Sequence, residues 1–468
     1  MKNKTDFAYQ AVYRYLLRLV NDAQETSPFK LPSLRQLARR LRVSISTVQS
    51  AYSLLEKEGR ICSVPKSGYY TIAAERGEVE RPSNRHDDDL LNAMCRSARR
   101  PGMWVIGDDE PTVVQLQASP LIAMERELAR HYPRFGSAGF QPFGDVELRT
   151  ALAARYTRDA GHGWYADDVY IAADLSSMLK AVIETLGLRE THVLVESPCS
   201  WGLLRLLQAY DIRIVELPLD ESGSVDLVVL DQVLEEHTFS LALLSSLLNP
   251  VCGRVRPWSN TQAVAERLER YKVRVLENDS HGDLSFTREQ GRLRDMIDPC
   301  RLIIMGCFAK TLGPEAPFGY VLCKGGEHEW QRYFLVHGFE LPPMRQKAIA
   351  RLYASGQMDT HLNSLVLALA ERMLEMNQAL DRHLAGILRY ERPTGGSAFW
   401  AECLSPVSMR RVFDDLLGQR IVITPGELFS AHAWHRQHLR IGYAIDWSQD
   451  TERLLATLRT AFEQARTP

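Results

Sequence analysis

Short apolar segments rich in Val, Ile and Leu recur through the middle of the chain, and helical stretches separate most of them. Segments of this length and composition are typical of buried strands. Their alternation with helices predicts an α/β domain whose sheet is largely parallel. The seven predicted strands are Val169–Ala172, Val193–Glu196, Ile212–Leu217, Leu241–Leu247, Val273–Glu277, Leu302–Gly306 and Phe318–Cys323.

The chain is long enough, at 468 residues, for two or three globular units with an ample core. From about Leu341 the pattern becomes helical through Leu388 and is then a mixture of helices and strands. The polar stretch before the large domain is punctuated by Pro and Gly and predicts a linker, with room for a short helix near Leu90 to Cys95. The predicted divisions are an N-terminal domain at 1–74, a linker at 75–103, a large α/β domain at 104–340 and a smaller C-terminal subdomain at 341–468.

The segment Leu31–Tyr70 predicts two short helices followed by a tight turn. Pro32 and Ser33 form a pre-helical proline and an N-cap, and Ser44 is a second N-cap candidate. Gly59 is expected to end the second helix. The apolar positions at helical spacing are Leu34, Leu37, Ala38 and Leu41 in the first helix, and Val48, Ala51, Leu54 and Leu55 in the second. This pattern predicts a helix-turn-helix.

The N-terminal domain has an excess of basic over acidic residues. Residues 1–74 hold 12 Lys and Arg against 5 Asp and Glu, whereas the formal net charge of the whole chain is −2. Short polar side chains on the second helix can reach base edges and phosphates in a major groove, and the following turn adds a cation. The alternative is an ordinary helical hairpin with a solvated basic face. Because the basic excess is localised, we predict double-stranded DNA as a partner.

These residues resemble the GntR family of bacterial regulators. The resemblance is carried by LPS-x-R-x-LA, by VS-x-x-TV-x-x-AY-x-x-LE and by SGYY, which together cover the DNA-binding region. Many members carry Arg after the VS pair, where this chain has Ile45. The resemblance implies DNA contacts from Arg35, Ser44, Ser46, Thr47 and Gln49, with Lys66 and Gly68 in a wing.

Motifs in the rest of the chain follow the order and approximate spacing of fold type I aminotransferases. With the GntR-like head, nearly all of the chain resembles the MocR subfamily of regulators. That resemblance implies a homodimer whose aminotransferase-shaped domain senses a small amine, an amino acid or pyridoxal phosphate. The motifs are Gly144–Arg149, Asn249–Pro250, Glu277–Asp279, Phe308–Leu312, Phe318–Tyr320, Thr424–Gly426 and Leu439–Ile441.

The resemblance gives three residues a role at the ligand site. Lys310 matches the lysine that forms a Schiff base with pyridoxal phosphate, and Asn249 matches the asparagine near the phenolic oxygen of the cofactor. Arg440 matches the arginine that clamps a substrate carboxylate. The sequence therefore predicts the cofactor lysine and an effector carboxylate site.

The acidic partner of the pyridine nitrogen is replaced. Asn278 stands where the family has Asp, and an amide cannot stabilise a pyridinium as a carboxylate does. His281 replaces the family Tyr at the phenolic oxygen. An alignment shifted by one residue would give the acidic role to Asp279. We prefer the unshifted alignment because three neighbours match the family, namely Glu277, Gly282 and Asp283.

The residues expected around a phosphate also differ from the family. Asp174 replaces a Gly at a helix N-terminus where backbone N–H groups would meet the phosphate; it is also simply a good N-cap. Pro317 replaces the phosphate-binding Arg, and Cys307 replaces a Ser. Ser200 stands where an aromatic ring stacks on the cofactor, with Trp201 as a neighbouring substitute. We therefore expect a degenerate pyridoxal phosphate site.

Three functions remain open on these residues. The first is a transcriptional regulator with a catalytically silent sensor domain, for which we assign no catalytic residue. The second is an active aminotransferase with an appended DNA-binding domain. The third is an architectural DNA-binding dimer that senses nothing. No apolar run of about 18 residues and no signal-peptide stretch occur, so we expect a cytoplasmic protein without a membrane segment. Eight scattered cysteines without metal spacing suggest reduced thiols and no metal site.

Overall fold

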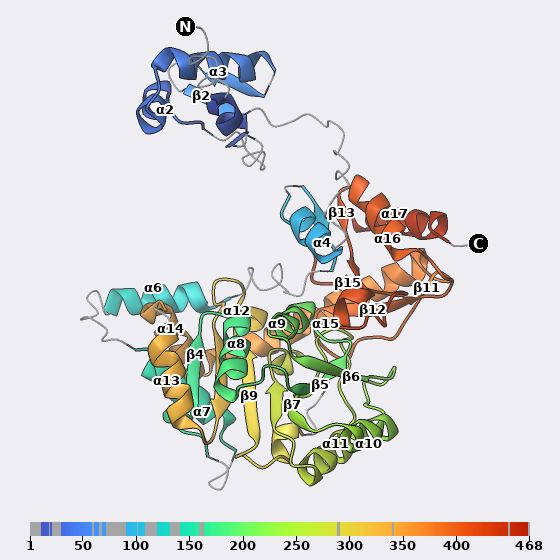
Figure 1. Cartoon of the computed structure of the whole chain (residues 1–468). Coiled ribbons are helices and arrows are strands. Elements are labelled where there is room, and N and C mark those ends of the chain that lie inside the picture. The colour runs from blue at the N-terminus through green and yellow to red at the C-terminus, as the bar shows by residue number, and fades with distance from the viewer. Residues whose placement is uncertain are drawn as a thin grey trace. The chain divides into compact units, whose positions relative to one another are not determined.

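The computed structural model describes residues 11–17, 19–20, 30–58, 60–64, 68–71, 90–100, 102–107, 119–131, 141–158, 163–287, 291–338, 341–447 and 450–466. These residues fall into two compact units. Figure 1 labels their helices and strands. The first contains the described residues up to Trp104 together with Leu417–Val422. The second contains the described residues of 105–416 and 423–468.

The N-terminal part of the first unit is a winged helix-turn-helix. Helices α2 (Leu34–Leu41) and α3 (Ile45–Lys57) are followed by the antiparallel hairpin of β1 (Ile61–Val64) and β2 (Gly68–Thr71). The predicted helix-turn-helix is therefore confirmed. Gly59 and the turn at 65–67 lie outside the described residues. The small core that unites these elements is built from Val12, Leu16, Val20, Leu37, Val48, Ala51, Tyr52, Leu55 and Ile61.

Local capping fixes where the two helices begin. Ser33 Oγ accepts a hydrogen bond from the N–H of Gln36 at 3.3 Å, and the Gln36 side chain accepts from the N–H of Ser33 at 3.1 Å. This reciprocal capping box satisfies two donors that the first turn of α2 leaves free. Ser44 Oγ accepts from the N–H of Thr47 at 3.1 Å and caps α3 in the same way. The chain turns between the helices at Arg42, which has φ 53°.

The remainder of the first unit is small. Helix α4 (Leu90–Ala98) lies where the sequence allowed a short helix within the predicted linker. Strand β3 (Trp104–Val105) pairs with β13 (Ile421–Val422), and the N–H of Trp104 donates to the carbonyl of Arg420 at 2.7 Å.

The second unit is built on a seven-stranded sheet, and each of its strands overlaps a predicted one. Its order is β4-β10-β9-β8-β7-β5-β6. Neighbours from β9 to β6 run parallel, and β10 is antiparallel to both β4 and β9. The predicted α/β fold with a largely parallel sheet is confirmed. The strands are β4 (Val169–Ala172), β5 (His192–Ser197), β6 (Arg213–Pro218), β7 (Phe239–Ser245), β8 (Val275–Asn278), β9 (Leu302–Cys307) and β10 (Gly319–Cys323).

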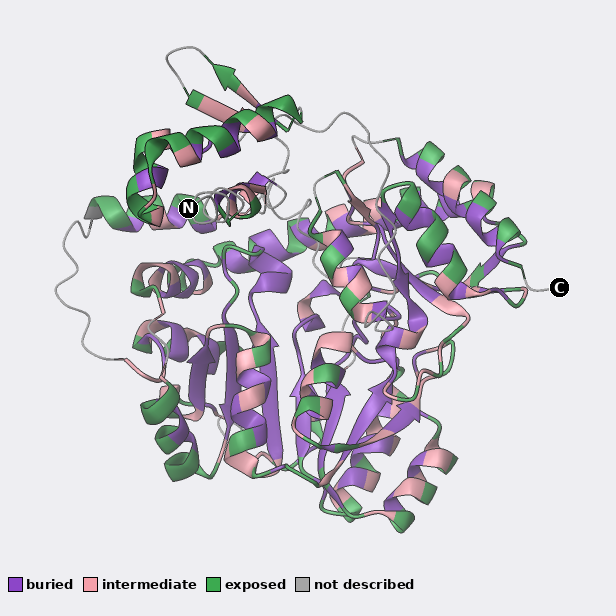
Figure 2. Cartoon of the chain, turned by 45° about the horizontal axis from the view of Figure 1, so that its top comes forward, coloured by how far each residue is buried: buried purple, intermediate pink, exposed green. Residues whose placement is uncertain are grey.

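Successive residues of a strand point to opposite sides of the sheet, so apolar strands give the sheet two apolar faces. Helices cover both of these faces. In β9, Leu302 and Ile304 join one core cluster, and Ile303 and Met305 join the other. Figure 2 shows the strands buried along their length and the helices exposed on their outer faces. The first cluster includes α6 (Leu121–His131), α7 (Val146–Tyr156), α10 (Leu227–Glu236), α11 (Trp258–Arg270) and α14 (Pro343–Ala354). The second includes α8 (Leu175–Leu186), α9 (Trp201–Ala209) and α13 (Glu327–His337).

The C-terminal part is helical and then mixed, as the sequence pattern predicts. A long helix leads into an antiparallel sheet of order β11-β12-β15-β14. The predicted boundary at residue 341 stays a prediction. Helix α14 follows this boundary in the sequence but packs in the same core as α6 and α7 of the large domain. No helix among the described residues has the length and apolarity needed to span a membrane. The elements are α15 (Gln357–His383), β11 (Leu388–Tyr390), β12 (Ala398–Cys403), α16 (Met409–Gly418), β14 (Thr424–Pro425), β15 (His438–Gly442) and α17 (Thr451–Gln464).

Gly319 lets two elements of the large domain approach each other closely. It is the first residue of β10, and a Cβ built on it would collide with the backbone carbonyl of Asp174 directly before α8. Backbone atoms cannot move aside as the end of a flexible side chain can. The Phe318–Tyr320 motif therefore has a steric reason for its central glycine.

Substituting Gly319→Ala is expected to lower the free energy of unfolding by about 1–3 kcal/mol, the usual cost of forcing an extra methyl group into a packed site. Urea denaturation monitored by circular dichroism measures this change. Gly418→Ala is the matched control, since a Cβ there meets nothing within 4 Å and lies in a helix. The control is expected to be neutral or stabilising by up to about 1 kcal/mol; equal losses in the two variants would contradict the steric argument.

Candidate functional site

A cavity of about 320 Å³ lies at the carboxyl ends of the central parallel strands. Asn278 ends β8 and Cys307 ends β9, and both line the cavity. Ligands of open α/β sheets bind at this edge, because the strand ends and the helix N-termini meet there. Of the residues selected from the sequence, the cavity brings together Asp174, Ser200, Trp201, Asn278, His281, Cys307, Lys310 and Pro317.

Lys310 lies on the short helix α12 (Ala309–Leu312), which follows β9 directly. The residue is 8 % exposed and lines the cavity. Among the described lining residues, Lys310 is the one Lys or Arg and Asp174 is the one Asp or Glu. The cavity is therefore lined by a buried lysine, whose primary amine is the group that imine chemistry with a carbonyl compound needs.

Asp174 closes the helix N-terminus that would otherwise face an anion. Its carboxylate accepts a hydrogen bond from the N–H of Ser177 at 2.6 Å and caps α8. The carboxylate thus occupies a donor of the helix end and adds a negative charge to the cavity. Pro317 has no side-chain donor, and the Cys307 thiol is a weak one. None of these three side chains therefore offers a phosphate group a charged hydrogen-bond donor.

Asn278 and His281 lie on the segment that leaves β8. Asn278 Oδ1 accepts from the N–H of Ser280 at 3.2 Å, and Ser280 Oγ lies 3.0 Å from His281 Nδ1. These bonds hold both side chains at the cavity. An amide there carries no charge, so it would stabilise a protonated ring nitrogen less than a carboxylate would.

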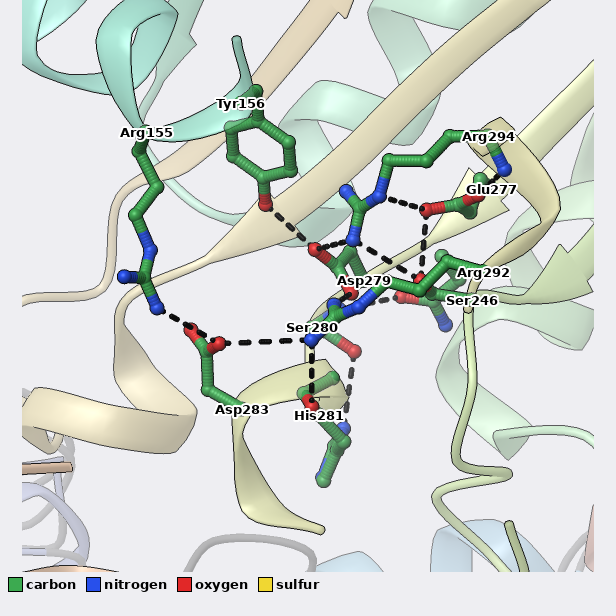
Figure 3. A network of polar contacts seen from close by, with 12 residues as sticks. Arg155, Tyr156, Ser246, Glu277, Asp279, Ser280, His281, Asp283, Arg292 and Arg294 are labelled. Carbon is green, nitrogen blue, oxygen red and sulfur yellow. Dashed lines mark hydrogen bonds and ion pairs between the residues drawn. The ribbon is translucent and has the colours of Figure 1, made fainter. Parts of the chain in front are cut away.

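Asp279 points away from this cavity into a network of buried ionic side chains (Figure 3). Its carboxylate accepts hydrogen bonds from Arg292 Nη1 at 2.5 Å, Arg294 Nη2 at 2.8 Å and the Tyr156 hydroxyl at 2.8 Å. Burial alone raises the pKa of Asp279, but the two guanidinium groups outweigh it and lower that pKa to about 2. Asp279 is therefore a structural anion.

Glu277 extends the same network beneath the sheet edge. Its carboxylate accepts from the Ser246 hydroxyl at 2.7 Å, and Arg294 Nε lies 3.2 Å away. Burial raises the pKa of Glu277. Sequence reasoning used Glu277 only as an alignment marker and missed Arg292 and Arg294, which the chain brings back from a later loop. Two arginines separated by one residue were the available signal.

Asn249 does not line the cavity, because its amide is fully used elsewhere. Its Nδ2 donates to a carboxylate oxygen of Glu196 at 3.1 Å and to the carbonyl of Pro198 at 3.0 Å. Its Oδ1 accepts from the N–H groups of Val251 at 2.9 Å and Cys252 at 3.1 Å. All four hydrogen-bonding positions of the amide are occupied within the protein.

Arg440 is also placed outside the lining of the cavity. It lies in β15, is fully buried, and donates from Nη1 to the carbonyl of Gly107 at 3.1 Å. Its Nη2 donates to Ser397 Oγ at 3.1 Å. The guanidinium therefore joins the backbone at Gly107 to the C-terminal sheet.

The predicted DNA contacts on α2 and α3 lie at the surface. Arg35, Ser44, Ser46 and Gln49 are exposed, and Thr47 is half-buried. Ser44 Oγ lies 2.8 Å from Ser46 Oγ and 2.7 Å from Thr47 Oγ1, so these hydroxyls form one cluster at the start of α3. In the wing, Gly68 begins β2 with φ 116°, and Lys66 lies outside the described residues.

Comparison with known proteins identifies both parts of the chain. Residues 8–70 match the family described as bacterial regulatory proteins, gntR family. The chain is 27% identical over 444 residues to the uncharacterised HTH-type transcriptional regulator YdcR of Escherichia coli, covering 92% of this chain and 93% of that protein. It is 24% identical over 471 residues to YjiR of the same organism, covering 97% and 99%. The chain is homologous to MocR-type regulators.

The fold beyond the N-terminal GntR-type domain is that of the aminotransferases. The alpha-aminoadipate aminotransferase LysN of Thermus thermophilus, solved with N-(5'-phosphopyridoxyl)-L-leucine, superposes with a TM-score of 0.70 at 20% identity. The superposition covers 81% of this chain and 95% of LysN. The predicted winged helix-turn-helix with an aminotransferase-like domain is confirmed.

Replacing Asp279→Asn is expected to lower the free energy of unfolding at pH 7 by about 3–5 kcal/mol, because it leaves two buried guanidinium groups without their shared anion. The pKa of Asp279 is depressed in the folded state, so its stabilisation is complete above the unfolded pKa of about 3.9. It is lost as the pH falls toward about 2.

Urea denaturation of both proteins at a series of pH values checks this. The difference between them should shrink below about pH 4, where the Asp279 carboxylate of the unfolded wild-type chain takes up a proton while that of the folded protein stays ionised. Asp167→Asn is the control, since that side chain is 89% exposed in its pair with Arg149 and its loss is expected to cost less than about 1 kcal/mol. A difference independent of pH would contradict the role of Asp279 as a buried anion.

Proposed function

We propose that this helix-turn-helix transcriptional regulator binds operator DNA through α2, α3 and the wing, and senses a small ligand in the cavity around Lys310 without catalysing transamination. One observation carries the sensor proposal. The cavity keeps the primary amine of Lys310, while Asp174 closes the helix end that would bind a phosphate. A ligand site is retained and the catalytic apparatus is not.

The DNA contacts are supported by the surface of α3. Its buried stripe packs into the core, which leaves Ser46 and Gln49 on an exposed polar face. Recognition helices of this motif contact base edges with their N-terminal residues. We assign Arg35, Ser44, Ser46, Thr47 and Gln49 to this contact, with Lys66 and Gly68 in the wing.

The loss of catalysis is supported by the residues beside Lys310. Proton transfers in transamination depend on an electron sink that a protonated pyridine ring supplies, and Asn278 cannot supply the anion that maintains it. Asp279 cannot move into that role without giving up its buried ion pairs with Arg292 and Arg294. We therefore propose a catalytically silent domain.

The effector we propose is a small amine or amino acid. Asp174 provides an anion for an ammonium group, and the rest of the lining provides hydroxyl, amide and imidazole groups from Ser200, Asn278 and His281. We propose that Arg440 contributes to carboxylate recognition if domain closure exchanges its bond to Gly107. Pyridoxal phosphate would bind weakly.

We propose that the protein acts as a homodimer in the cytoplasm. Two DNA-binding heads tethered in one dimer bind paired half-sites more tightly than either head alone, because the second binding step is intramolecular. A ligand that binds one conformation of the large domain better than another shifts the population toward it. The linker then gives the heads a different spacing or freedom.

Arg35→Ala is expected to weaken operator binding by about 1–3 kcal/mol, the usual loss for a side chain that contacts DNA. Gel-shift titration of the full-length protein at fixed salt measures it. Arg126→Ala is the control, because it removes the same charge from an exposed position on α6. Unchanged affinity in Arg35→Ala would remove Arg35 from the interface.

The double substitution Asp174→Gly with Pro317→Arg is expected to raise the affinity for pyridoxal phosphate by about tenfold or more, because it removes a repelling charge and adds a charged donor worth about 1–3 kcal/mol. Absorbance titration in the visible range, followed by borohydride reduction and peptide mapping of Lys310, measures the binding. Asp226→Gly, at the N-cap of α10, is the matched control and should leave the affinity for pyridoxal phosphate unchanged. No gain in the double variant would contradict the assignment of the phosphate end.

A further inference from the structure

Ile45 exposes a large apolar side chain at the start of a polar helix face. It is the first residue of α3 and is 48% exposed. The stripe that α3 buries consists of Val48, Ala51, Tyr52 and Leu55, so the core of the domain does not use Ile45. An isolated exposed apolar residue needs no explanation by itself. Ile45 has a special position, however, because it begins the second helix of a helix-turn-helix, the helix that contacts DNA in this motif.

The groups around Ile45 are held in place by one another. Ser44 caps the helix through the N–H of Thr47 at 3.1 Å. The hydroxyls of Ser46 and Thr47 lie within 2.8 Å and 2.7 Å of the Ser44 hydroxyl. The helix start is capped and the hydroxyls on either side of Ile45 are hydrogen-bonded to each other. The backbone that carries Ile45 is therefore held in one conformation. Gln49 lies one turn further along the same face and is exposed.

The N-terminal residues of a recognition helix reach base edges in the major groove. Among the groups that base pairs present there, the apolar one is the C5-methyl of thymine, whereas guanine presents two acceptors suited to Arg. We propose that Ile45 is a specificity-determining residue that contacts the methyl group of a thymine in each half-site of the operator. This inference rests on the proposed DNA-binding function.

The contact is tested with duplexes that differ by a single methyl group. Full-length protein is used to select duplexes from a random pool, and each thymine of the recovered site is then replaced in turn by uracil. Uracil keeps the base pairing and loses only the C5-methyl. At one position per half-site the wild type is expected to lose about fourfold in affinity, the worth of one buried methyl group.

The variant Ile45→Ala connects that loss to the side chain. It should bind the thymine duplex about as weakly as the wild type binds the uracil duplex, and the uracil replacement should then cost it nothing. Val64→Ala is the matched control, because Val64 is a 41% exposed apolar residue in the wing hairpin. The control should keep the full sensitivity to uracil. Since Ile45 is exposed, thermal unfolding of Ile45→Ala should match that of the wild type.

The possible results separate this inference from the function on which it rests. If the protein selects a sequence but binds thymine and uracil duplexes equally at every position, the role of Ile45 is wrong and the regulator stands. If Ile45→Ala retains the penalty for uracil, another residue reads the methyl and the inference is overturned. If no duplex is enriched from the pool, DNA binding itself fails. Selection with Ile45→Arg is expected to replace the preferred thymine by guanine.

Discussion

The common direction of β5, β7, β8 and β9 determines where the side chains that line the cavity come together. Parallel strands end at the same edge of a sheet, and the connections that leave them bring side chains together there. Asn278 ends β8, Cys307 ends β9, and Lys310 follows within one helical turn. Residues far apart in the chain therefore share one cavity because the strands have one direction.

Buried ionic groups beneath that edge hold the strand ends in place. Arg256 forms an ion pair with Glu196 near the end of β5, and Glu196 also accepts from the Ser245 hydroxyl in β7 and from Asn249. On the neighbouring side, Asp279 is fixed by Arg292 and Arg294. Removing one partner of such a pair leaves an uncompensated charge in the interior, which costs far more than an exposed pair does. The strand ends are thus held by ion pairs of residues that do not line the cavity.

The N-termini of α3 and α8 use their free N–H donors differently. Helix α8 is capped by Asp174, which turns a positive helix end into a place that disfavours phosphate. Helix α3 is capped by the small hydroxyl of Ser44, which adds no charge and leaves Ile45 and Gln49 clear to approach a base pair. The same local device therefore has different electrostatic consequences at the two helix ends, since these depend on the charge and size of the capping side chain.

Local patterns in the sequence were enough to predict the seven strands and the two capped helices of the DNA-binding head. Each of these depends on neighbours within a few positions, through periodicity, capping and residue type. The roles of Asn249, Asp279 and Arg440 did not follow from such patterns. Asp279 is bound by Arg292 and Arg294, which come from a later segment of the chain. The amide of Asn249 forms its hydrogen bonds with Glu196 in β5 and with backbone groups of its own turn. Arg440 donates to the carbonyl of Gly107, 333 positions away. Hydrogen bonds and ion pairs between distant segments exist only once the chain has folded, so tertiary structure alone decided which polar groups face the cavity and which are used in the interior.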